Sequence, residues 1–141
     1  MMKPSVYVLL GMGLFAAAQV QAADRQLFLP IEDALQTPTA QEVLNPNIKL
    51  HFARGGGEVL VRDVVTNKKT NAFAKSDEKA CAHVFLSAVR QLQDRAEKEG
   101  GSGVSNIVSY YKRNVHASTQ EYECHAGGVI AGVALKGDVV R

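Results

Sequence analysis

The stretch SDEKACAHVFLSAVRQLQDRAEKEGG, residues 76–101, decides the fold because it predicts one long helix. Ser76 is a good N-cap residue, and the two acidic residues after it favour the positive end of the helix dipole. Gly100 and Gly101 end the helix. Between these signals apolar residues recur every three or four positions, which predicts one buried helix face. We expect a helix over about residues 77–99.

Apolar segments on both sides of this helix predict a sheet of about five strands. The strands are expected at residues 48–52, 59–65, 104–111, 119–126 and 129–136. Glycines 55–57 predict a hairpin turn between the first two, and glycines 127–128 predict a tight turn before the last. The order strand, strand, helix, strand, strand, strand predicts an α+β domain over residues 48–141, with the helix packed on the sheet.

Residues 23–47 are less regular and predict an N-terminal arm with short helical turns. Thr39 and Glu42 match a capping box, in which each side chain satisfies a free backbone donor at the start of a helix. The Asn45-Pro46 pair ends that helix. We expect the arm to pack on the main body.

The first 22 residues have the three parts of an export signal. Lys3 supplies the positive start, residues 6–18 are apolar, and Val20-Gln21-Ala22 is a small-x-small cleavage pattern. The apolar run is shorter than the ~20 residues that span a bilayer. We therefore expect cleavage after Ala22, a periplasmic location and no membrane anchor after cleavage.

The composition argues against a nucleic-acid partner. The chain has 16 Lys and Arg against 14 Asp and Glu, and its formal net charge is +2. Nucleic-acid-binding domains normally carry a clustered basic surface. Glycines 55–57 are not followed by the Gly-Lys-Ser/Thr of a phosphate-binding loop, so we expect no nucleotide cofactor.

Each of the two cysteines has a histidine close by, so a disulfide and a metal site both have to be considered. Cys81 falls on the apolar face of the helix, whereas His83 lies about 200° around it. Cys124 shares a strand face with Tyr122, and His125 takes the opposite face. The sulfurs therefore converge while the imidazoles diverge. This geometry, and the expected export, favour a disulfide between Cys81 and Cys124.

Two alternatives to a non-catalytic binding protein stay open. Glu121, Glu123 and His125 alternate along one strand and share a face, where they offer ligands to a borderline metal cation. The two Cys-His neighbourhoods are a second ligand set. A small hydrolase would need His51 or His116 beside a serine or a carboxylate, because catalytic groups meet in space and not in sequence.

Residues 66–75, TNKKTNAFAK, predict a polar loop before the helix. It carries three lysines and one aromatic residue, which suits recognition of a partner. The alternative is that the aromatic residue folds into the core as a lid. The candidate recognition residues are Lys68, Lys69, Asn71, Phe73 and Lys75.

Three segments resemble a group of small exported proteobacterial proteins often named "excinuclease ATPase subunit". They are KKTNAFAKSDEKAC (68–81), QDRAEKEGGSGVSNIVSYYKRN (93–114) and YECHAGGVIAGVALKGDVV (122–140). That name implies DNA repair and ATP hydrolysis, but this sequence has no Walker-type motif and no zinc module. We expect neither activity. The helix, Gly-rich turn and Val/Ile strand are also loosely similar to small α+β envelope domains such as the lipoprotein stress sensor of enteric bacteria.

These observations predict an exported, disulfide-linked protein that binds a protein or another envelope component. Mass spectrometry of the protein expressed from the full chain should show loss of residues 1–22 and a mass two hydrogen atoms below that of the reduced form, with no bound metal. Stoichiometric zinc or copper that is lost in Cys124→Ser would overturn the disulfide.

Overall fold

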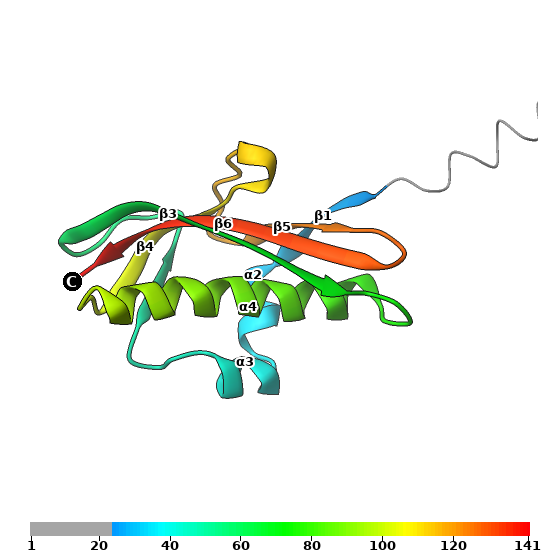
Figure 1. Ribbon diagram of the computed structural model, residues 1–141, viewed down its shortest axis with the longest axis horizontal. Coiled ribbons are helices and arrows are strands. Elements are labelled where there is room, and N and C mark those ends of the chain that lie inside the picture. Colours follow the sequence, from blue (N-terminus) through cyan, green and yellow to red (C-terminus); the bar gives the residue numbers. More distant parts are fainter. Residues whose placement is uncertain (1–23) are drawn as a thin grey trace, which may run out of the picture.

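One long helix lies along one face of a curved sheet, and two short helices pack against that helix (Figure 1). The computed structural model describes residues 24–141, so the expected export signal lies outside the described residues. The elements are β1 (Arg25–Pro30), α2 (Ile31–Leu35), α3 (Pro38–Val43), β2 (Lys49–Phe52), β3 (Val59–Asn71), α4 (Asp77–Lys98), β4 (Gly103–Ser109), η2 (Tyr111–Arg113), β5 (Glu121–Ala126) and β6 (Ile130–Val140). The α+β class is confirmed, as is the order of strands and long helix from β2 onward.

The sheet is built on β6. On one side, β6 pairs antiparallel with β3 along its whole length. On the other side, β5 and β4 pair with its first and second halves. β1 then extends the sheet beyond β5, and β2 extends it beyond β4 as a parallel strand. Only Ile130 and Lys136 of β6 are not buried, and its small and β-branched residues suit a strand covered on both faces.

The helix α4 begins and ends almost where the sequence predicts. The Ser76 hydroxyl accepts a hydrogen bond from the Lys79 amide at 3.2 Å, which confirms the N-cap. The last helical residue is Lys98. At the centre of the buried face, the Phe85 ring stacks on Tyr122 of β5, with ring centroids 4.0 Å apart. This pair joins the helix to the sheet.

The predicted disulfide between Cys81 and Cys124 is present. Both residues are fully buried, and their Cα atoms are 6.0 Å apart, within the range that a disulfide spans. His83 is exposed, and His125 lies on the sheet face opposite α4. The bond therefore links the first turns of α4 to β5.

The predicted hairpin at glycines 55–57 is wrong. β2 pairs with β4, whereas β3 crosses to the far side of β6. At the start of β3, the Glu58 amide donates to the carbonyl of Arg141 at 2.9 Å, and the reverse bond is 2.8 Å. Gly57 has a φ of +77° beside Val140, where a side chain would crowd the chain. The loop at glycines 55–57 therefore carries the chain from β2 to the free edge of β6. There β3 supplies the hydrogen bonds that the buried β6 requires along that edge.

The predicted loop over residues 66–75 is wrong in its first part. β3 continues through Asn71, so Lys68 and Lys69 belong to a strand. Side chains alternate along this part of the strand, with Thr66 buried and Lys69 exposed. Among residues 24–141, β3 pairs only with β6, and lysines are common on such edge strands because they discourage further pairing.

The segment expected as an N-terminal arm contributes a strand and two short helices. β1 pairs with β5 over its whole length, so the sheet has six strands instead of five. The predicted cap at Thr39 is wrong: the Thr37 hydroxyl accepts from the Ala40 amide at 3.2 Å. Pro38 takes the first helical position, where its missing N–H costs nothing.

Replacing both Cys81 and Cys124 by serine should lower the free energy of unfolding by about 4 kcal/mol, because the disulfide closes a loop between residues 43 positions apart. Urea unfolding measures this difference. A reducing agent should destabilise the wild type and leave the double variant unchanged. Equal midpoints for the oxidised wild type and the double variant would contradict the prediction.

Candidate functional site

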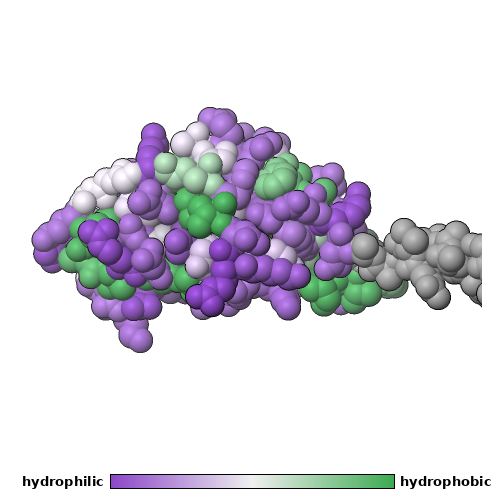
Figure 2. Space-filling view, turned by 90° about the horizontal axis from the view of Figure 1, so that it is seen from above, coloured by the Kyte–Doolittle hydropathy of each residue, from purple (hydrophilic) through white to green (hydrophobic). Residues whose placement is uncertain are grey.

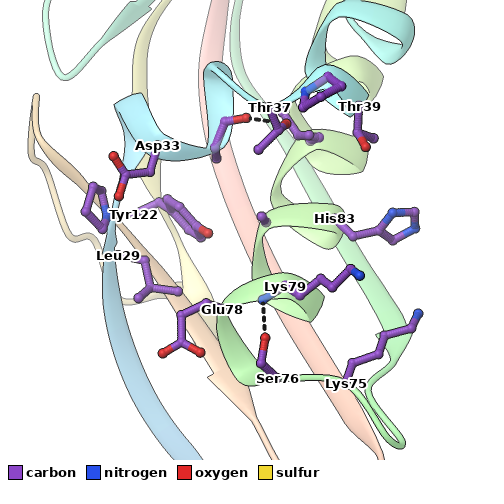
Figure 3. A pocket seen from close by; sticks show the side chains of 15 residues that line it. Leu29, Asp33, Thr37, Thr39, Lys75, Ser76, Glu78, Lys79, His83 and Tyr122 are labelled. Carbon is purple, nitrogen blue, oxygen red and sulfur yellow. Dashed lines mark hydrogen bonds between the residues drawn. The ribbon is translucent and has the colours of Figure 1, made fainter.

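A groove of about 580 Å³ opens where β1, α2 and α3 lie beside the first half of α4 (Figure 3). Its volume is typical of sites that bind small molecules or short peptide segments. The groove exists because β1 passes straight into α2, and the Ile31 amide is held by the carbonyl of Gln120 at 2.8 Å. This bond fixes the wall opposite α4.

The floor of the groove is apolar. α4 contributes Ala82 and Leu86, and the facing wall contributes apolar residues from β1, α2 and α3. Small side chains at Ala34 and Ala82 leave space between the two walls. The apolar lining residues are Leu29, Pro30, Ala34, Pro38, Ala82 and Leu86.

The Tyr122 hydroxyl points into the groove from its floor (Figure 3). The ring is buried between α4 and the sheet. Burial raises the pKa of the Tyr122 phenol well above its ordinary value, and the charges of Asp33 and Glu78 raise it further. The phenol therefore stays neutral and is able to donate and to accept a hydrogen bond.

Charges of both signs flank the groove. Asp33 and Glu78 lie on one side, and Lys75, Lys79 and His83 lie on the other (Figure 3). An apolar floor between opposite charges suits a ligand that combines apolar and polar groups along its length.

The structure brings together two of the three predicted metal ligands. His125 Nε2 lies 2.5 Å from Glu123 Oε2, and the Gln26 amide donates to the same oxygen at 2.9 Å. The ring of Tyr111 stacks on His125. Glu121 is exposed, and residues 24–141 contain no group of three or more His, Cys, Asp or Glu placed to hold a metal ion. Glu123 and His125 therefore form a partly buried polar pair on the outer sheet face.

The candidate histidines of a hydrolase lie apart from the groove. In residues 24–141, no hydrogen bond joins the side chain of His51 or His116 to a serine or a carboxylate. His116 packs against Phe28, with ring centroids 4.5 Å apart. The described residues therefore assemble no nucleophile and base at either histidine.

The predicted recognition residues lie at one end of the sheet. Lys68, Lys69 and Asn71 are in β3, while Phe73 and Lys75 are in the connection to α4. Phe73 is 71% exposed, so the alternative in which it folds into the core is wrong. Of these residues, Lys75 lines the groove.

The groove is not evident from the sequence, because its lining comes from three separated segments: residues 29–39, residues 75–86 and Tyr122. One signal was available: Tyr122 shares a strand face with Cys124 and was expected to face the helix. The pairing of β1 with β5, which places Leu29 opposite Tyr122, is not visible in any local pattern.

Comparison with protein-family models, curated proteins and solved structures gives no match for this chain. Within residues 24–141, no helix is both long enough and apolar enough to cross a membrane. The inference of function therefore depends on the geometry of the groove.

The raised pKa of Tyr122 predicts how stability changes in alkali. Above the ordinary phenol pKa of 10.0, Tyr122 ionises only in the unfolded chain, so unfolding releases a proton and stability falls as the pH rises. Tyr122→Phe should therefore lose less stability between about pH 9 and pH 11 than the wild type. Urea unfolding across this range measures both slopes, and identical slopes would contradict the prediction.

Proposed function

We propose that this protein is an exported, non-catalytic binding protein of the cell envelope, and that its groove binds a segment of polypeptide. One observation carries the proposal: the groove combines an apolar floor, a neutral phenol and charges of both signs in its lining. A polypeptide offers all the matching groups, because apolar side chains alternate with charged ones and amides both donate and accept.

A lipid acyl chain fits the same volume less well. Such a ligand presents one charged end and a long apolar tail, whereas the groove lining carries two carboxylates, Asp33 and Glu78, together with Lys75 and Lys79. An anionic head near the lysines would also lie near the two carboxylates. A lining with charges of both signs instead favours a ligand that also carries both signs.

Export is the setting that we propose for this function. A disulfide persists in oxidising compartments, and the Cys81–Cys124 bond supports such a location. The export signal predicted in residues 1–22, with cleavage after Ala22, agrees with a periplasmic site. We also propose that the protein is related to the small exported proteobacterial proteins that three of its segments resemble.

The test fills the groove at its floor. Ala82→Phe should weaken peptide binding by at least about tenfold, because the added ring occupies the space between α4 and β1. Lys98→Phe, at an exposed position near the end of the same helix, is the matched control. The probe is a set of fluorescent synthetic peptides that alternate apolar residues with charges of both signs, and fluorescence anisotropy measures binding.

A second variant tests the proposal independently, in case Ala82→Phe does not fold. Lys79→Glu reverses the charge of an exposed residue of the groove lining. It should weaken the binding of peptides rich in acidic groups and strengthen the binding of peptides rich in basic groups. If no peptide binds, and dodecanoate binds in a way that Ala82→Phe abolishes, then the groove takes acyl chains and the polypeptide proposal is wrong.

A further inference from the structure

A second surface lies at the end of the molecule where β3 passes into α4. Three apolar side chains are exposed there: Phe73 is 71% exposed, Val129 57% and Ile130 48%. They are neighbours because the Ala72 amide donates to the carbonyl of Val129 at 2.6 Å and Asn71 pairs with Ile130. We call these three residues the apolar tip.

The apolar tip protrudes. The connection between β3 and α4 and the turn between β5 and β6 both lie at this end of the molecule (Figure 1). Figure 2 shows hydrophobic residues at the same end of the molecule. β1 also starts here, since Arg25 pairs with Ala126. A partner for a protruding tip has to be soft or concave.

Free positive charge lies beside the apolar tip on its β3 side. Lys69 lies two residues before Asn71 and therefore on the same face of the sheet as Asn71 and Ile130. Lys68 and Lys75 lie within five residues of Phe73 in the chain. None of these three lysines forms an ion pair with another residue of the described chain. The nearby carboxylate of Asp77 is already paired with Arg25.

We propose that the apolar tip docks this protein on an anionic membrane surface. Phe73, Val129 and Ile130 would enter the region between lipid head groups and acyl chains, while the lysines contact lipid phosphates. Exposed apolar side chains with adjacent lysines are the combination that interfacial binding uses. Each lysine near such a surface adds affinity that salt screens.

A second copy of this chain is a poorer partner for the apolar tip. Most homodimers are related by a two-fold axis, so equivalent patches would face each other. The unpaired lysines of one copy would then approach those of the other, and like charges repel. An anionic lipid surface neutralises the same lysines.

Docking would also orient the groove of the proposed function, although it does not depend on that function. Lys75 both follows Phe73 in the chain and lines the groove. A molecule seated on its apolar tip would therefore hold one end of the groove near the membrane, where polypeptides emerge after export.

The test uses the processed protein purified from cells that express the full chain. Sedimentation with vesicles of phosphatidylglycerol mixed with phosphatidylcholine should show binding that high salt weakens, and vesicles of phosphatidylcholine alone should bind much less. Phe73→Ser and Ile130→Ser should each reduce binding to the mixed vesicles, Phe73→Ser by about tenfold.

Val65→Ser is the matched control for Ile130→Ser. Val65 lies on the same ladder and sheet face and has nearly the same exposure, 49%. It is six residues from Asn71 along β3, or about 20 Å. Its substitution should leave vesicle binding unchanged.

Lys68→Gln with Lys69→Gln should weaken binding by about tenfold and reduce its dependence on salt. These lysines do not line the groove, so peptide binding should remain. If the wild type does not bind the mixed vesicles, the proposal is wrong. It is also wrong if Phe73→Ser binds them as strongly as the control Val65→Ser does. A dimer in size-exclusion chromatography that Phe73→Ser alone dissociates, without vesicle binding, would also overturn it and show self-association.

Discussion

The fold depends on the burial and two-sided pairing of β6. Nearly all of this strand is covered, and a buried strand needs hydrogen-bond partners along both edges. β3 therefore passes over glycines 55–57 to reach one edge, while β4 and β5 share the other. The helix α4 then covers β6 and β3 on one face. The remaining elements, β1, β2, α2 and α3, attach to this centre.

The residues that stabilise the fold also position the groove. Cys124 and Tyr122 point to the same side of β5, so the disulfide to Cys81 holds Tyr122 against α4. Phe85 stacks on the Tyr122 ring and leaves its hydroxyl directed into the groove. The first half of α4 therefore has two roles, because its buried stripe forms the core and its next face forms a groove wall.

The two proposed surfaces meet at the start of α4. The connection that presents Phe73 also carries Lys75 to the rim of the groove. The apolar tip and the groove would then adjoin at the start of α4. The capped first turn at Ser76 fixes the position of this junction. The pair formed by Glu123 and His125 on the outer sheet face belongs to neither surface.

The sequence alone determined the features that depend on local pattern: the helix from its cap at Ser76 to about Glu99, one residue beyond its end in the structure, the turn before β6 and the convergence of Cys81 and Cys124. It could not determine that β2 pairs with β4, that β3 extends to Asn71, or that β1 and α4 enclose a groove. Periodicity reports only which side of an element is buried. The partner of each strand edge is chosen by distant residues that compete for the same hydrogen bonds, and only the tertiary structure decides that competition.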